Sequence, residues 1–257
     1  MRVNTVKKAL KEGKLQIGCG FNQIRSLEVP RILAAAGFHW TFLDAEHGGF
    51  DIETLQDLCH ECAVAGVSPI VRVADMQYAL VARALDCGAQ GVIFPRVESP
   101  ELLERAISWT KFPPRGVRGF GLNPAHVDYE RATIPQILEH MNENVMVVLQ
   151  IETRLAVERR EELLSVPGID AVLIGPVDLS ISLGVPGDFQ HPAMIEAMEK
   201  IRASCLKHGV APGTQTRTVA LAKFWIERGM KFVGSGSETG FLFEKACEVA
   251  GALRTAV

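Results

Sequence analysis

The 257-residue sequence lacks the features that mark membrane, nucleic-acid-binding and secreted proteins. It has no apolar run of about 18 residues, so no membrane-spanning helix is predicted. The net charge of −3 provides no basic excess that would attract nucleic acid or an acidic membrane. The first residues, MRVNTVKKALKEGK, are charged and contain no apolar core of the secretory type. We therefore expect a cytoplasmic protein with no nucleic-acid partner and no membrane attachment.

The six cysteines do not form the pattern of a disulfide framework, because they are scattered through apolar segments. Cys59 and Cys62 have a spacing found in zinc sites, but no second CxxC and no HxxxH follows. Both fall in a helical pattern of apolar residues, where free cysteines commonly serve as small buried side chains. We expect a reduced protein with no structural zinc.

Short apolar runs alternate with segments of helical periodicity along the whole chain. Strands are predicted at residues 16–21, 40–44, 69–73, 91–95, 145–151, 171–175, 210–214 and 231–234. Glycines that typically end helices follow the helical segments, at Gly37, Gly66, Gly88, Gly209 and Gly229. Eight strands alternating with helices predict a single α/β domain over residues 1–257, a (β/α)8 TIM-type barrel. An extra N-terminal amphipathic helix is expected, with Val3, Val6 and Leu10 on one side.

One segment interrupts this alternation. Residues 111–129, KFPPRGVRGFGLNPAHVDY, are rich in glycine and proline and carry two arginines. A loop of this length in a compact domain commonly has a function or contacts another subunit.

In a (β/α)8 barrel the active site lies at the C-terminal ends of the strands. Several predicted strands finish there with polar or charged residues, among them Asp44, Arg72, Gln150 and Asp178. This accumulation on one rim predicts a site for chemistry at that end of the barrel.

Gln150 and Glu152 are two positions apart, so both side chains are expected on one face of their strand. Asp178 ends the next strand and would lie beside them. Two carboxylates in a partly buried mouth need a proton, an arginine or a divalent cation between them. Oxygen ligands of this kind suit Mg²⁺ or Mn²⁺. The alternatives are helix-capping roles, with Asp178 as an N-cap and Glu152 as a charge at a helix start.

Arg72 ends an apolar strand, where a buried arginine requires an anionic partner. It either forms an ion pair with Asp44, Glu46 or Asp75, or it binds a carboxylate or enolate oxygen of a substrate. His47 lies three residues after Asp44, an arrangement that predicts an imidazole oriented by a carboxylate and acting as a general base.

The lysines argue against imine catalysis, which needs a desolvated lysine in the barrel interior. All of them fall in helical or loop segments or at the start of a strand, and none ends a strand on the predicted rim.

Six motifs together resemble the HpcH/HpaI family of metal-dependent pyruvate aldolases, which act on 4-hydroxy-2-oxo acids and 2-keto-3-deoxy sugar acids. They are LDAEHG (43–48), VRV (71–73), LDCGAQGVIFPRVES (85–99), PPRGVRG (113–119), QIET (150–153) and GPVDLSISLG (175–184). They run through most of the chain in the family's order, and as a set they are highly specific.

The resemblance implies a role for each matching residue. Glu152 and Asp178 resemble the ligands of a divalent metal (Mg²⁺, Mn²⁺ or Co²⁺), with no organic cofactor. Gln150 supports the bound substrate, and Arg72 contacts the pyruvyl keto oxygen. The backbone of Gly175, Pro176, Val177 and Asp178 resembles the cradle of the pyruvate carboxylate.

The same resemblance assigns His47 as the base, acting through a water, and Asp44 as the group that orients it. Asp86 resembles an acid that a neighbouring subunit supplies. The family assembles as a homo-oligomer, usually a hexamer built as a trimer of dimers. The C-terminal helix, residues 241–253, then packs on a partner or alternatively closes its own barrel.

The implied reaction cleaves or forms 4-hydroxy-2-oxo acids, giving pyruvate and an aldehyde through a pyruvate enolate stabilised by the metal. Three alternatives remain: an acyl-CoA lyase, an oxaloacetate decarboxylase and a non-catalytic small-acid-binding barrel. The acyl-CoA alternative needs basic residues for the cofactor phosphates, and Arg115 and Arg118 are the nearby candidates. Departures from the family pattern at Ala45, Val177, residues 120–129 and residues 213–216 lie on the acceptor side.

Overall fold

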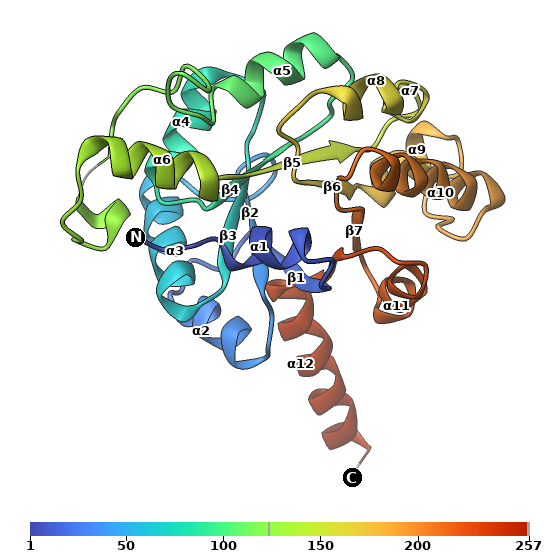
Figure 1. Cartoon of the computed structure of the whole chain (residues 1–257). Helices are drawn as coiled ribbons and strands as arrows, with labels where there is room; N and C mark the ends of the chain where they lie inside the picture. Colours follow the sequence, from blue (N-terminus) through green and yellow to red (C-terminus); the bar gives the residue numbers. More distant parts are fainter. Residues whose placement is uncertain (123, 256–257) are drawn as a thin grey trace.

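The computed structural model describes residues 1–122 and 124–255; Asn123, within the predicted long loop, and the last two residues lie outside the described residues. In the described part, eight parallel strands pair in chain order and close into a barrel, with β8 hydrogen-bonded to β1 (Figure 1). The strands are β1 (Gln16–Phe21), β2 (Trp40–Asp44), β3 (Ser68–Arg72), β4 (Gly91–Phe94), β5 (Met146–Ile151), β6 (Ala171–Ile174), β7 (Gly213–Thr216) and β8 (Phe232–Ser237). This confirms the predicted (β/α)8 barrel.

Helices cover the outside of the barrel and connect successive strands (Figure 1). They are α1 (Thr5–Lys11), α2 (Glu28–Ala35), α3 (Ile52–Ala65), α4 (Tyr78–Asp86), α5 (Pro100–Ser108), the 3₁₀ helix η1 (Pro124–Val127), α6 (Ile134–Asn144), α7 (Arg154–Glu158), α8 (Arg160–Ser165), α9 (Pro176–Ser182), α10 (Pro192–Lys207), α11 (Val219–Glu227) and α12 (Glu238–Arg254). The five predicted helix-ending glycines all have φ between 69° and 97°, the left-handed conformation that glycine adopts without a steric penalty.

The sequence placed β7 about three residues too early and ended β8 too soon. Residues 210–214 look like a strand because they begin with valine and alanine. Pro212 has no N–H to donate to a neighbouring strand, so the regular ladder begins only at Gly213. The correction moves Gln215 and Thr216 into β7 and brings Arg217 to the rim of the barrel.

Cys59 and Cys62 lie fully buried in α3, as predicted. Burial raises the pKa of both thiols well above its ordinary value.

The N-terminal end of the barrel is filled by apolar side chains. Trp40 stacks on Phe232 inside the barrel with ring centroids 4.0 Å apart. Val6 and Leu10 of α1 pack on the same interior cluster. Val3 lies before the helix and is 54% exposed, so it is not part of the apolar side that Val6 and Leu10 form. These side chains fill the barrel interior at its N-terminal end.

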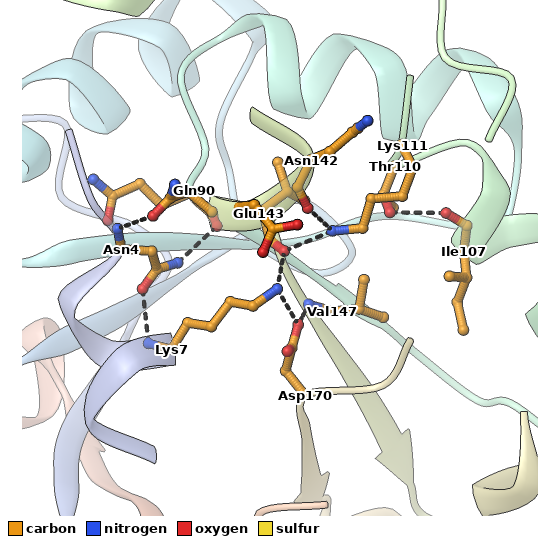
Figure 2. A network of polar contacts seen from close by, with 12 residues as sticks. Asn4, Lys7, Gln90, Ile107, Thr110, Lys111, Asn142, Glu143, Val147 and Asp170 are labelled. Carbon is orange, nitrogen blue, oxygen red and sulfur yellow. Dashed lines mark hydrogen bonds and ion pairs between the residues drawn. The ribbon is translucent and has the colours of Figure 1, made fainter. Parts of the chain in front are cut away.

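A network of polar contacts holds α1 and the start of the long loop (111–129) against the N-terminal end of the barrel (Figure 2). Lys7 Nζ donates to the carbonyl of Val145 at 2.8 Å and lies 3.1 Å from Asp170 Oδ2. Lys111 Nζ donates to the carbonyls of Asn142 at 2.7 Å and Val145 at 3.0 Å. Both lysines are buried, and burial lowers the pKa of Lys111 to about 7.

The free energy of unfolding is expected to rise as the pH increases from about 7 to about 10, and part of this rise is expected to come from the titration of Lys111. An unfolded lysine titrates near about 10.4, so in this window the unfolded chain binds more protons than the folded chain. Linkage then stabilises the fold as pH rises, with a slope of up to about 1.4 kcal/mol per pH unit. Urea unfolding of wild type and Lys111→Met across this window should show the slope reduced in the variant. Lys14→Met, at a side chain 68% exposed, serves as the control. Equal slopes in wild type and Lys111→Met would contradict the prediction.

Helix α12 projects away from the barrel (Figure 1). Its first residue, Glu238, is buried and accepts the backbone N–H groups of Asn22, Gln23 and Ile24 at 2.7–3.1 Å. From Phe241 onward its described side chains are exposed, including Phe243 at 71% and Leu253 at 67%. The alternative in which this helix closes its own barrel is therefore wrong. In the described part of the chain, no helix combines the length and apolar character needed to cross a bilayer.

Candidate active site

The C-terminal ends of the strands surround an open cavity of about 550 Å³. The predicted site residues that line it are Asp44, His47, Arg72, Gln150, Gly175, Pro176, Val177 and Asp178. Glu152 is buried beside Gln150, in hydrogen-bonding contact with it. The structure therefore brings together every predicted site residue except Asp86.

Arg72 is held by two carboxylates. Its Nη2 and Nε donate to Asp44 Oδ2 at 2.6 Å and Oδ1 at 3.0 Å, and its Nη1 lies 3.1 Å from Glu46 Oε2. The alternative of an internal ion pair is confirmed for these two acids, whereas Asp75 accepts from the backbone of Met76 instead. Burial disfavours the charged form of Arg72 and lowers its pKa. The hydrogen bond to Asp44 and the negative charge of Asp44 have the larger combined effect, so the pKa of Arg72 is raised.

The expected contact between Asp44 and the His47 ring is wrong. Both Asp44 oxygens are engaged by Arg72, and Oδ1 also accepts the backbone N–H groups of Glu46 and His47 at 3.0 and 3.2 Å. The His47 ring is 70% exposed at the cavity, and its Nε2 lies 3.7 Å from Glu46 Oε1. Glu46, to which the sequence assigned no partner, thus bridges Arg72 and His47. Asp44 instead positions the turn that carries the imidazole.

Gln150 and Glu152 share one side of β5, as strand alternation predicted. Gln150 Nε2 donates to Glu152 Oε2 at 2.5 Å, and the backbone N–H of Arg96 donates to Glu152 Oε1 at 2.9 Å. Arg96 has a φ of 51°, which is unusual for a residue with a side chain. Thr153, not Glu152, caps α7 by accepting from Ala156, so the capping alternative for Glu152 is wrong.

Asp178 is the third residue of α9, whose N-cap is Gly175. Its role is therefore not that of an N-cap, and its exposed side chain lines the cavity. The first bond of the helix runs from the N–H of Leu179 to the carbonyl of Gly175 at 3.0 Å. The N–H groups of Val177 and Asp178 precede that bond and are available to a ligand by helix geometry.

The electrostatics at Glu152 favour a bound cation. Burial raises the pKa of Glu152, the N–H of Arg96 lowers it, and the charges of Asp178 and Glu46 raise it, with a net increase. Gln150 Oε1 is buried with no hydrogen-bond partner among the described residues. Carboxylate and amide oxygens are the ligands that a hard divalent ion prefers. Among residues 1–122 and 124–255 no group of three His, Cys, Asp or Glu side chains is placed to hold a metal. Glu152 and Asp178, whose charges influence each other, are the two carboxylates near which such an ion would bind.

Asp86 lies away from this cavity, at the end of α4. Helix α4 follows β3 and runs back toward the filled end of the barrel, where Gln90 begins the approach to β4. Asp86 Oδ1 accepts from Arg118 Nη2 at 2.8 Å, and Arg118 also packs over the Phe112 ring. Asp86 therefore does not contribute to the cavity of its own chain.

Sequence reasoning missed several residues of the cavity wall, including Asn22, Arg217, Ser237 and Glu244. It noted the polar character of residues 213–216 but ended the strand at Thr214. Gln215 donates from Nε2 to the carbonyl of Gly236 at 2.8 Å, and its Oε1 occupies the space that a side chain at Gly234 would fill. Two features of the sequence could have revealed these residues: the polar stretch TQTR (214–217) at the end of β7, and the glycine-rich sequence of the neighbouring strand β8.

Comparison with known proteins identifies the family of this chain. Residues 16–244 match the model of the family described as HpcH/HpaI aldolase/citrate lyase. A 4-hydroxy-2-oxo-heptane-1,7-dioate aldolase of Escherichia coli is 35% identical over 99% of this chain and 97% of the relative. The crystal structure of an HpcH/HpaI aldolase from Desulfitobacterium hafniense DCB-2 superposes with a TM-score of 0.92 at 31% identity, covering 96% of each chain. A structure of an HpcH/HpaI aldolase/citrate lyase family protein from Burkholderia cenocepacia J2315 gives 0.90 at 30% identity, covering 98% of this chain and 100% of that one. The chain therefore belongs to the HpcH/HpaI aldolase/citrate lyase family of carbon–carbon lyases.

Proposed function

We propose that this protein cleaves 4-hydroxy-2-oxo acids reversibly into pyruvate and an aldehyde, with a divalent metal ion as its cofactor. The observation that carries the proposal is the placement of the buried Glu152 carboxylate, in hydrogen-bonding contact with Gln150, beside a cavity that Gln150, Asp178 and Arg72 line. Membership of a family of carbon–carbon lyases supports it.

Glu152 and Asp178 are the residues that would hold the ion, with Gln150 beside them. A bound Mg²⁺, Mn²⁺ or Co²⁺ supplies Lewis-acid polarisation of the keto group. The free N–H groups of Val177 and Asp178 are suited to the pyruvate carboxylate, because the N-terminus of a helix attracts negative charge. The Arg72 guanidinium, fixed by Asp44 and Glu46, faces the negative charge that develops on the keto oxygen.

His47 is the residue that removes the proton of the C4 hydroxyl group, through a water, since its ring is exposed to the cavity. The electron pair of the C3–C4 bond then passes to the C2 keto oxygen, giving pyruvate enolate, and the aldehyde departs. Protonation of C3 yields pyruvate. Glu46, 3.7 Å from the ring, is placed to stabilise the imidazolium that forms.

Exchange of the pyruvate methyl protons in heavy water, followed by NMR, tests this proposal without knowledge of the aldehyde. We expect exchange with added Mg²⁺ or Mn²⁺ and none after chelation. Binding of pyruvate without exchange would favour the non-catalytic small-acid-binding barrel. Exchange that survives exhaustive chelation would also contradict the proposal, because enolate formation would then not need the ion.

Gly175→Ala is expected to weaken Mn²⁺ binding and to slow this exchange by about 10- to 100-fold. A Cβ atom at position 175 would lie 2.5 Å from Glu152 Oε2 and 3.0 Å from Gln150 Nε2, so both side chains would have to move. Ser165→Ala, at an exposed position at the end of α8 and outside the cavity, is the control. Titration calorimetry with Mn²⁺ and the exchange assay measure the two effects. Unchanged Mn²⁺ affinity in Gly175→Ala would contradict the placement of the ion at Glu152.

We also propose a homo-oligomer, a hexamer built as a trimer of dimers. The exposed apolar side chains of α12 and the position of Asp86 outside its own cavity support this assembly. Light scattering coupled to gel filtration should give a mass of six times the 28.1 kDa chain. A monomeric mass would contradict it, and would leave Asp86 with no role in catalysis.

The two arginines that the sequence offered for the acyl-CoA lyase alternative do not support it. Arg118 is buried and paired with Asp86, and Arg115 forms an exposed ion pair with Glu143. Neither arginine lines the cavity. Decarboxylation of oxaloacetate would pass through the same enolate and would use the same residues.

A further inference from the structure

Two arginines line the cavity, and they differ in how their charge is used. Arg72 is neutralised by Asp44 and Glu46, with side-chain exposures of 12%, 4% and 10%. Arg217 is exposed and forms no ion pair or hydrogen bond with any of the described residues. Its guanidinium is thus a cation on the cavity wall that the folded chain leaves available to a ligand.

The backbone at Arg217 is fixed although its side chain is not. Thr216 is the last residue of β7, and its hydroxyl lies within hydrogen-bonding distance of the carbonyls of Thr218 and Gly234. Thr218 caps α11 by accepting the N–H of Leu221 at 3.3 Å. Arg217 is therefore held between a paired strand and a capped helix, so binding a ligand requires ordering of the side chain only.

The barrel topology places Arg217 opposite Arg72. In the closed order of eight strands, β7 is four positions from β3 in either direction. Register pairs Ile174 with Thr214 and Thr216 with Ser235, so Arg217 lies between the Gly175–Asp178 segment and the end of β8. A substrate whose keto-acid end lies between β3, β5 and β6 would extend its other end toward β7.

We propose, on the basis of the proposed function, that Arg217 binds a carboxylate at the far end of the aldehyde and makes this enzyme selective for anionic acceptors. The planar guanidinium donates two parallel hydrogen bonds to a carboxylate. Asp178 belongs to the proposed metal site and Asp44 is paired with Arg72, so neither is a free negative charge beside Arg217. Glu244 also lines the wall and lies beyond 4.0 Å from Arg217.

The test compares two aldehydes of equal chain length, 4-oxobutanoate and butanal, in aldol addition to saturating pyruvate. We expect Arg217→Gln to lower the ratio of kcat/KM for 4-oxobutanoate to that for butanal by about 10- to 100-fold, the usual effect of a hydrogen bond between charged groups. The loss should be mainly in KM, because the contact is remote from the reacting atoms. Arg217→Lys should retain part of the preference, since it keeps the charge but loses the paired geometry.

Lys223→Gln removes one positive charge from the exposed face of α11, outside the cavity, and is the charge-matched control. It should leave the ratio unchanged. A ratio that changes by less than about threefold in Arg217→Gln, or that falls equally in Lys223→Gln, would overturn the role of Arg217. Methyl-proton exchange by the same wild-type preparation separates the two proposals. If the wild type exchanges the methyl protons but Arg217→Gln leaves the kcat/KM ratio unchanged, only the inference about Arg217 is rejected. If the wild type shows no exchange, the proposed function is rejected and the inference with it.

Discussion

Arg72→Ala is expected to reduce metal-dependent exchange of the pyruvate methyl protons by about 10³-fold and to lower the free energy of unfolding by about 3 kcal/mol. The activity falls because the guanidinium no longer stabilises the enolate oxygen. The stability falls because Asp44 and Glu46, 4% and 10% exposed, lose their counterion. An uncompensated buried charge is the costly outcome of breaking such a pair.

A second variant separates the two effects. Arg72→Met combined with Asp44→Asn removes one of the stranded charges, so it should regain much of the stability while remaining inactive. Urea unfolding and the exchange assay on the same samples measure both quantities. Recovery of activity together with stability would show that Arg72 acts only by maintaining the fold, and would exclude it from the reaction.

Glu152→Gln is expected to abolish Mn²⁺ binding and exchange while leaving the protein equally stable or more stable by about 1 kcal/mol. Because the pKa of Glu152 is raised, the folded chain binds its proton more tightly than the unfolded chain. Ionisation of this group therefore opposes folding at neutral pH, and a neutral amide avoids that cost. Gln150 can also turn its amide, so that its unpartnered Oε1 accepts from the new side chain.

Titration calorimetry with Mn²⁺ and thermal unfolding test this pair of effects. Glu152→Asp retains the charge on a shorter side chain and is the control for geometry. In the wild type, Mn²⁺ affinity should fall as the pH is lowered through the raised pKa of Glu152, because the ion competes with a proton. A strongly destabilised Glu152→Gln would contradict the prediction, since it would mean that the carboxylate serves the fold rather than a cation.

The sequence predicted the bounds of β1 to β6 to within one residue. β1 and β2 begin and end where predicted, and β5 begins one residue later than predicted. The two-residue alternation of Gln150 and Glu152 was enough to place both side chains together. The placement of Gln150 and Glu152 could be predicted because it depends only on the geometry of one strand.

The partners of Asp44 and His47 could not be predicted in the same way. Asp44 lies three positions from His47 in the chain, but β2 pairs with β3 in a register that places Arg72 directly opposite Asp44. A guanidinium with two donors competes for the carboxylate more effectively than an imidazole. The nearness of Asp44 and His47 in sequence therefore suggested a contact that the sheet register replaced.

The amino-acid sequence by itself determined the alternation of eight strands and eight or more helices, and therefore which residues reach the C-terminal rim. Those properties follow from hydrophobic periodicity and from strand-end residues, which are local. Tertiary structure alone decided how charge is shared on that rim. The pairing of β2 with β3 placed Arg72 beside Asp44 and Glu46. The return of α4 took Asp86 away from its own cavity, and Arg217 has no internal partner among the described residues. Charge pairing depends on distances between separate elements, and these distances exist only in the folded barrel.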